Sequence, residues 1–311
     1  MRILLAVDGS AGADTARALV TGLSWPAGSR IEAVRVVEPL SNVVGSPGFA
    51  FVGSMEDVLG VDEARRALHV EVAGMARDGL TVSTRVLVGR PATVLVAHAR
   101  ESGADLLVMG SRGRGPIASM VLGSVSAEVA TDAPCPVLVV RTATVRRVIV
   151  ALDGTTEADR VVEEVAASAF LRDAHLHIVS VAPSVIPGPG ILMGGGFESS
   201  VGVYEDAVAS ARRDLEQRAA IAAAHLAGEG LAVTWAVPEG DAAETLIDTA
   251  VRGNADLIVV GTHGRTGLTR LVVGSVARDV LLHAHTSVLV LHEPHAVKPE
   301  EQATRPTAGI A

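Results

Sequence analysis

The chain carries one glycine pattern twice, at the same internal spacing in each copy. The pattern consists of two glycines three positions apart and, after nine further residues, a Gly-Ser pair. Its anchors are Gly110, Gly113, Gly123 and Ser124 in the first copy and Gly261, Gly264, Gly274 and Ser275 in the second. Each anchor of the second copy lies 151 residues after its counterpart. Two copies at so long a period predict a tandem pair of domains rather than a solenoid.

The repeat extends beyond the glycines. The opening MRILLAVDGS returns as RRVIVALDGT at 146–155, and a length of 311 residues suits two domains. We therefore predict domains at 1–142 and 146–293, joined near residues 141–145. Proline and charge in residues 294–311 predict a disordered tail.

Composition excludes several classes of function. A net charge of −9 argues against general binding of nucleic acid or anionic membranes. No apolar run approaches the ~20 residues of a membrane span, and the first residues resemble a strand rather than a signal peptide. The single cysteine, Cys135, suits a reducing compartment. We expect a cytoplasmic protein.

Apolar runs alternate with helical patterns in both halves. Strands are expected at 3–7, 31–37, 81–88, 106–110 and 137–140, and again at 147–152, 175–181, 231–237, 257–261 and 288–292. Helices are expected at 13–23, 56–78, 91–102 and 119–131, then at 157–170, 203–228, 241–252 and before the last strand. This order predicts an α/β fold with open parallel sheets and helices on both faces. Ligands of such sheets bind at the carboxyl ends of strands, and the glycine loops should lie there along a common edge.

The glycine loops have the chemistry of phosphate sites. Gly110 and Gly261 end a strand, where a missing side chain would let a ligand lie against the backbone. Gly113 and Gly264 can take positive φ and turn N–H groups inward, which forms an anion-binding concavity. The Gly-Ser pairs at 123–124 and 274–275 would offer helix-start N–H groups and a hydroxyl. The alternative is that these glycines serve only tight turns and close packing of helix on sheet.

The residues that could balance phosphate charge are few. A Walker loop is absent and the only lysine, Lys298, lies in the tail, which leaves Arg112, Arg114, Arg265 or a divalent ion. His263 holds the place of Arg112 in the second copy.

An aspartate ends the first strand of each half, Asp8 and Asp153. It could bind Mg²⁺ or accept a hydrogen bond from ribose or adenine; the alternative is a helix cap.

The AVDGS and ALDGT openings, the long loop after the second strand and the G-x2-G-x9-G-[ST] spacing resemble a tandem universal stress protein. The resemblance covers nearly all of residues 1–292. It implies two adenine-nucleotide alpha-hydrolase-like (Rossmann-like) domains, each with a five-stranded parallel sheet that binds ATP. It also implies that the last strands, 137–140 and 288–292, meet edge to edge as an intrachain pseudo-dimer. A homodimer of whole chains is compatible with the sequence.

The resemblance also implies the residues of each site. The aspartates are Asp8 and Asp153, and the valines whose backbone meets adenine are Val36 and Val181. The loop residues are Gly110, Gly113, Gly123 and Ser124, then Gly261, Gly264, Gly274 and Ser275. Arg112 and His263, which share one loop position in the two halves, complete the predicted sites.

Three functions remain open from the sequence. The first is an ATP-binding regulator of stress response or growth arrest, with Mg²⁺ accompanying the nucleotide. The second is a slow ATP hydrolase or nucleotidyl-transfer enzyme, although no residue stands out as a base and the HxGH and SGGxDS elements are missing. The third is a scaffold with vestigial sites. No cluster has transition-metal spacing, and the loops at 38–55 and 183–202 are either lids or surface connections.

Overall fold

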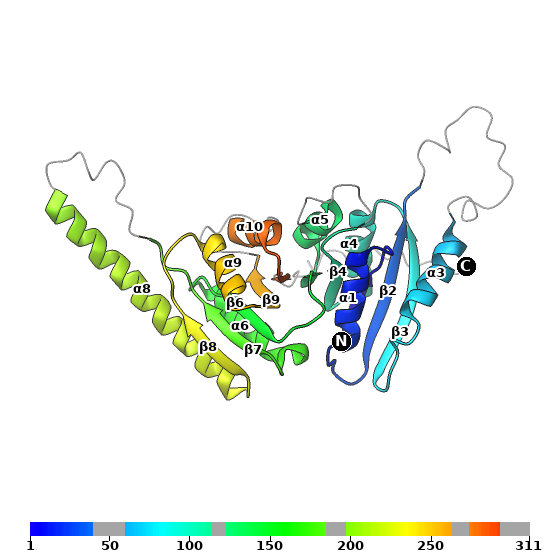
Figure 1. Cartoon of the computed structure of the whole chain (residues 1–311), viewed down its shortest axis with the longest axis horizontal. Coiled ribbons are helices and arrows are strands. Elements are labelled where there is room, and N and C mark those ends of the chain that lie inside the picture. Colours follow the sequence, from blue (N-terminus) through cyan, green and yellow to red (C-terminus); the bar gives the residue numbers. More distant parts are fainter. Residues whose placement is uncertain (40–59, 114–121, 185–196, 263–273, 293–311) are drawn as a thin grey trace, which may run out of the picture.

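The computed structural model describes residues 1–39, 60–113, 122–184, 197–262 and 274–292. These residues form a ten-stranded sheet with helices on both of its faces (Figure 1). The predicted α/β fold is confirmed. The predicted tail, 294–311, lies outside the described residues.

The described elements of the first half alternate as predicted. In chain order they are β1 (Arg2–Ala6), α1 (Ala11–Gly22), β2 (Ser29–Val37), α3 (Val61–Val72), β3 (Leu80–Val88), α4 (Pro91–Ser102), β4 (Leu106–Gly110), α5 (Ser124–Asp132) and β5 (Val137–Val140). The second half repeats this order. Its elements are β6 (Arg147–Ala151), α6 (Thr156–Ala167), the 3₁₀ turn η1 (Ala169–Leu171), β7 (His175–Val179), α8 (Phe197–Gly228), β8 (Ala232–Ala236), α9 (Ala242–Arg252), β9 (Leu257–Gly261), α10 (Ser275–His283) and β10 (Ser287–Leu291).

The sheet runs in the order β3-β2-β1-β4-β5-β10-β9-β6-β7-β8. Within each half all neighbours pair in parallel, whereas β5 and β10 pair antiparallel, with Leu138 opposite Leu289. The expectation that the last strands of the two halves meet edge to edge is confirmed. The expectation of a common edge for both glycine loops is wrong, because antiparallel pairing puts the carboxyl ends of the two halves at opposite edges of the sheet.

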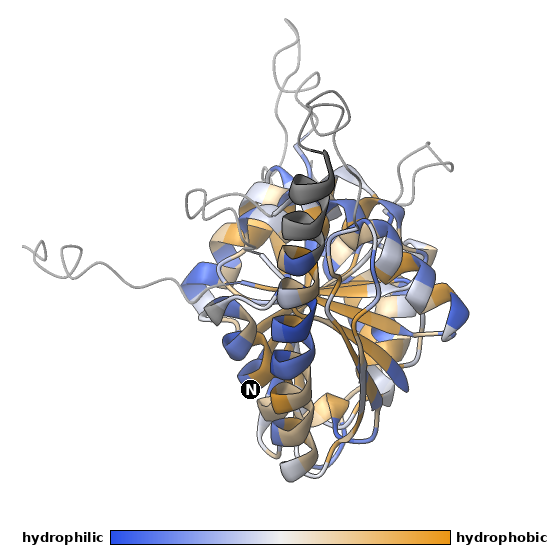
Figure 2. Cartoon of the chain, turned by 90° about the vertical axis from the view of Figure 1, so that its left-hand side faces the viewer, coloured by the Kyte–Doolittle hydropathy of each residue, from blue (hydrophilic) through white to orange (hydrophobic). Residues whose placement is uncertain are grey.

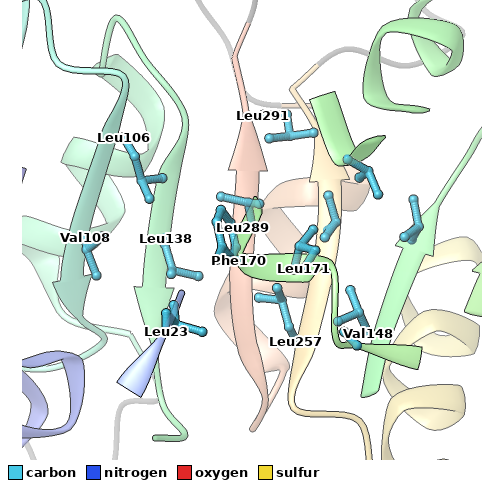
Figure 3. Close-up of a cluster of buried hydrophobic side chains, with 14 of the residues drawn as sticks. Leu23, Leu106, Val108, Leu138, Val148, Phe170, Leu171, Leu257, Leu289 and Leu291 are labelled. Atoms are coloured by element: carbon cyan, nitrogen blue, oxygen red, sulfur yellow. The ribbon is translucent and has the colours of Figure 1, made fainter. Parts of the chain in front are cut away.

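Valine, leucine, isoleucine and alanine make up most of the core, as the low aromatic content requires. Helices α1, α3, α6 and α8 cover one face of the sheet, and α4, α5, α9 and α10 cover the other. Figure 2 shows hydrophobic strands in the interior, with α8 in front of them carrying both hydrophilic and hydrophobic residues along its length. On the first face one cluster crosses from half to half, with Leu138 and Leu289 beside Phe170 (Figure 3). Phe170 also lies 5.5 Å, between ring centroids, from Trp25 of the first half.

The segment that joins the halves is held against the second half. The backbone N–H of Thr142 donates to Ser287 Oγ at 3.1 Å, and its hydroxyl donates to the Asp256 carbonyl at 3.0 Å. The Asp256 carboxylate accepts the N–H groups of Arg146 and Arg147 at 2.8 and 3.0 Å. The joining segment is therefore anchored at both of its ends.

Some predicted helix ends are wrong. The helix expected to reach residue 78 ends at Val72, because Gly74 takes a φ of +84° and Arg77 bridges to Leu80. The helix expected over 157–170 ends at Ala167 and gives way to η1. The helix expected to begin at residue 203 begins at Phe197.

Candidate functional site

The aspartate turn after β1 belongs to the first half's candidate site. Asp8 Oδ1 accepts the backbone N–H of Ser10 at 3.0 Å, and Ser10 Oγ accepts the N–H of Ala13 at 3.2 Å. Ser10 is thus the N-cap of α1. The capping role considered for Asp8 is filled by Ser10, while Asp8 shapes the turn that leads into the helix.

Backbone hydrogen bonds hold both ends of the glycine loop that follows β4. The N–H of Ser111 donates to the Val140 carbonyl at 3.0 Å, and the Ser111 carbonyl accepts the N–H of Gly123 at 2.7 Å. The buried hydroxyl of Ser126 donates to the Gly110 carbonyl at 2.9 Å. These bonds fix the start of α5 beside the end of β4.

The glycine loop lies directly against the aspartate turn. A Cβ added to Gly113 would lie 2.7 Å from Asp8 Oδ2, and Ser10 Oγ donates to the Arg112 carbonyl at 3.2 Å. The φ of Gly113 is not positive, so the expectation for its backbone is wrong. Glycine fits here because a carboxylate occupies the space of a side chain.

Helix α1 occupies the space next to Gly110. A Cβ on Gly110 would lie 2.7 Å from the Gly12 carbonyl oxygen and 2.9 Å from the Ala13 nitrogen. The space that was predicted to admit a ligand is filled by the first turn of α1. Gly110 instead permits close packing of helix on sheet, which was the alternative considered. Gly12 was missed, and only its place between two alanines hints at close packing.

Groups that suit an anion gather at the start of α5. Gly123 is the N-cap of this helix, and Ser124, its first residue, is exposed. The first N–H groups of a helix lack intrahelical acceptors and carry partial positive charge. Arg112 is also exposed, on the loop that Gly123 closes. The start of α5 therefore lies next to the loop that carries Arg112 and that packs, through Gly113, against the Asp8 carboxylate.

Val36 lies on β2 beside this turn. The N–H of Val7 donates to the Val34 carbonyl at 2.8 Å, so the polar backbone groups of Val34 face β1. Polar backbone groups alternate along a strand, so those of Val36 face the same side, just past the last paired residue of β1. This backbone is available to a planar ligand at the carboxyl end of the strand.

The described part of the second site repeats this framework. The N–H of Thr262 donates to the Leu291 carbonyl at 3.1 Å, and the N–H of Gly274 donates to the Thr262 carbonyl at 2.6 Å. Asp153 Oδ1 accepts from the Thr155 N–H at 3.0 Å and from its hydroxyl at 2.6 Å. Gly261 ends β9, Ser275 begins α10, and Val181 follows β7. His263 and Gly264, like Arg114 and Arg265, lie outside the described residues.

The sequence profile of the Universal stress protein family matches residues 1–141 and 144–292. The chain belongs to this family, as a tandem member. Relatives agree: a Thermus aquaticus universal stress protein is 39% identical over 140 residues, which cover 45% of this chain and 97% of the relative. The universal stress protein Rv2005c of Mycobacterium tuberculosis is 29% identical over 238 residues, which cover 73% of this chain and 74% of the relative.

Solved structures support the same fold. A universal stress protein from Archaeoglobus fulgidus superposes with a TM-score of 0.59 at 18% identity. The match covers 94% of this chain and 96% of that one. The tandem universal stress protein architecture thus holds over nearly the whole chain.

The two universal stress protein halves differ at the helix that faces the loop. A Cβ on Gly12 would lie 2.5 Å from the Arg112 carbonyl oxygen, and the second half has Glu157 at the matching position. Glycine at position 12 therefore lets the first loop lie directly against α1, whereas the residues of the second half that correspond to Arg112 and its neighbours lie outside the described part of the chain. The two halves share a framework but differ in sequence at this position of the helix.

A groove of about 650 Å³ lies between α6 and α8, away from the glycine loops. Its lining mixes acidic, basic and apolar side chains, including Glu163, Arg218 and Ile221. Volume alone does not identify a site, and the groove lacks the convergence of backbone N–H groups found at the start of α5. We therefore place the candidate site at the loops.

The described residues offer neither a metal-binding cluster nor a membrane-spanning helix. Within the described ranges, no set of three or more histidine, cysteine, aspartate or glutamate side chains is placed to hold a metal ion. In the same ranges, no helix combines the length and apolar character needed to cross a membrane.

Proposed function

We propose that this universal stress protein binds ATP, together with Mg²⁺, at one site in each half. It would act in the cytoplasm as a nucleotide-dependent regulator of stress response or growth arrest. The proposal rests on the pairing of Asp8 with a glycine loop that leads into the N-terminus of α5. Membership of the family supports a shared role for both halves.

The pairing of Asp8 and Gly113 carries the proposal. A loop and a helix start that offer N–H groups suit phosphate oxygens. A carboxylate beside them would repel a bare phosphate, so it suits either a ribose hydroxyl or a Mg²⁺ ion between the carboxylate and phosphate. Val36 offers backbone polar groups at the same strand end, as an adenine base requires. A nucleotide combines the phosphate, the ribose and the adenine base that these protein groups suit.

The second site is supported by its matching framework. Asp153 shapes a turn like that of Asp8, and Gly274 closes on Thr262 as Gly123 closes on Ser111. The Asp153 carboxylate and the start of α10 would take the roles proposed for Asp8 and α5. Two nucleotides per chain are therefore expected.

Calorimetric titration of the full chain with ATP and Mg²⁺ tests the proposal. We expect about two sites in the unaltered chain and about one in Gly113→Val, because valine branches would collide with the Asp8 carboxylate. The matched control is Gly22→Ala, since a Cβ there meets nothing within 4 Å; it should keep two sites. No binding by the unaltered chain would overturn the proposal, and full stoichiometry in Gly113→Val would overturn the site assignment.

Hydrolysis is the competing function, and the same samples decide it. Asp8 Oδ1 is held by the Ser10 N–H, so this oxygen is poorly placed to activate water. We expect phosphate release to be negligible over the time in which binding saturates. Steady release that is lost in Gly113→Val would favour the enzyme instead.

A further inference from the structure

Two residues hold helices that belong to the opposite half of the molecule. Arg141 follows β5, and its Nη2 donates to the Leu281 carbonyl of α10 at 2.6 Å, while Nη1 donates to the Thr286 carbonyl at 3.1 Å. His292 follows β10, and its Nε2 donates to the Ala130 carbonyl of α5 at 3.0 Å. Neither residue was predicted from the sequence.

The two contacts are related by the internal repeat. His292 lies 151 residues after Arg141, and Leu281 lies 151 residues after Ala130, the offset of the glycine anchors. Each residue therefore donates a hydrogen bond from its own half to the C-terminal turn of a helix in the other half. A side-chain donor at a helix C-terminus satisfies a carbonyl that has no intrahelical partner, and a cation there also suits the helix dipole.

The helices held in this way are the ones that begin at the glycine loops. Helix α5 starts at Ser124 and α10 at Ser275, and each has nine residues. At 1.5 Å per residue such a helix is only about 13 Å long. A shift at the held C-terminus therefore moves the N–H groups at the opposite end.

Arg141 and His292 each follow a residue that is hydrogen-bonded to the start of the glycine loop in the same half. The N–H of Ser111 donates to the carbonyl of Val140, which directly precedes Arg141, and the N–H of Thr262 donates likewise to Leu291, which precedes His292. Burial, and secondarily the charge of Arg112, lowers the pKa of Arg141 to about 10. The Arg141 guanidinium therefore stays protonated near neutral pH and lies within electrostatic reach of a first-loop residue.

We propose that Arg141 is a positioning residue for the second nucleotide site and His292 for the first. Each residue sets, across the junction of the halves, the helix that presents N–H groups to phosphate. The two sites are thereby coupled, because each loop is bonded beside the residue that holds the other site's helix. This inference rests on the proposed function.

The test measures each site alone, in chains that keep only one. Gly113→Val leaves the second site, and Gly264→Val leaves the first. We expect Arg141→Ala to weaken ATP–Mg²⁺ binding about fivefold or more in the Gly113→Val chain, within the usual range of intersite coupling, and less than about twofold in the Gly264→Val chain. His292→Ala should show the reverse pattern. The control is Arg66→Ala, an exposed arginine on α3, which should change neither affinity.

Conservative variants guard against simple loss of folding. Arg141→Lys keeps a cationic donor and His292→Gln keeps an N–H donor at nearly the same reach, so both should retain most of the affinity. If an alanine variant weakens only the site in its own half, or both sites equally, the inference is overturned. If the Lys and Gln variants lose as much affinity as the alanine variants, the inference is also overturned.

Hydrogen exchange separates this inference from the proposed function. In the ligand-free chain, Arg141→Ala should increase amide exchange in 275–283 and not in 124–132, and His292→Ala should do the opposite. If the unaltered chain binds no nucleotide, the proposed function fails while this crossed exchange still reports the contacts. If nucleotide binds but neither measurement shows the crossed pattern, the inference fails and the proposed function stands.

Discussion

Gly110 at the end of β4 packs directly on Gly12 in the first turn of α1. A Cβ on Gly110 would come within 2.7 Å of the Gly12 carbonyl oxygen. The helix carrying the Ser10 cap, and with it the aspartate turn, therefore depends on two facing residues without side chains. This contact joins the packing of the core to the geometry of the candidate site.

Gly110→Ala should destabilise the chain, because the new methyl group forces α1 away from β4. Overpacking of this kind costs about 1–3 kcal/mol, read as a drop in the free energy of unfolding in urea. Gly22→Ala adds the same methyl group at the last residue of α1, where nothing lies within 4 Å. That control should be neutral or slightly stabilising. Equal effects at both positions would contradict the packing described.

The ion pair between Arg35 and Glu71 should be strongly coupled. Arg35 Nη2 donates to both carboxylate oxygens, at 2.7 and 2.8 Å, and Arg35 is only 8% exposed. Glu71→Ala leaves a nearly buried cation, which we expect to cost about 2–3 kcal/mol, below the ~3–5 of a fully buried pair because Glu71 is partly exposed. Replacing Arg35 by methionine as well should recover part of that loss. A urea double-mutant cycle measures the coupling, and additive losses would exclude it.

The thiol of Cys135 should be inert in the folded chain. Burial, and secondarily the charge of Asp105, raises its pKa to about 12. The thiolate is the reactive species, so labelling with a disulfide reagent at about pH 8 should be slow until the chain unfolds. The labelling rate in increasing denaturant should then follow the unfolding transition. Rapid labelling without denaturant would show that the thiol is accessible.

Glu32 should stabilise the fold more at neutral pH than in acid. Burial by itself would raise its pKa, but hydrogen bonds from Arg85 and His98, at 2.6 and 2.7 Å, leave the pKa below the usual value of 4.5. A carboxyl with a lowered folded-state pKa contributes stability that is present above 4.5 and is lost as the pH falls through the folded value. The difference in unfolding free energy between the unaltered chain and Glu32→Gln should therefore shrink on acidification. A difference that grew in acid would show that folding raises the pKa of Glu32 instead of lowering it.

Local signals predicted the elements that their own residues define. Pro91 opens α4 and Gly103, with a φ of +60°, ends it, and the predicted range of this helix is the observed one. Helix α3 was predicted too long, because Gly74 turns the chain after Val72 and distant contacts hold the residues that follow. Arg77 turns away from the helix and donates to the Thr21 carbonyl at 2.7 Å. Periodicity within a segment carries no information about such a partner.

The position of the candidate site was predicted from the sequence, but the packing around it was not. The spacing of the glycines located the loops. Because the loops and Asp8 follow strands of one parallel sheet, their sequence positions also predicted that Asp8 lies near Gly113. It did not show that Gly110 accommodates α1, because that depends on how α1 packs on the sheet. Arg141 and His292 were missed because their helix partners lie 140 and 162 residues away in the chain.

The antiparallel pairing of β5 with β10 also limits how the two halves can move relative to each other. Hinge closure of one half onto the other needs a few residues that can absorb large changes in φ and ψ. Here the halves are connected by paired strands, with Val137–Val139 opposite residues 288–290. Separating these strands would expose the apolar cluster beneath them. Movement of one half as a rigid body against the other would therefore have to break this pairing, so the two halves move together as long as β5 and β10 stay paired.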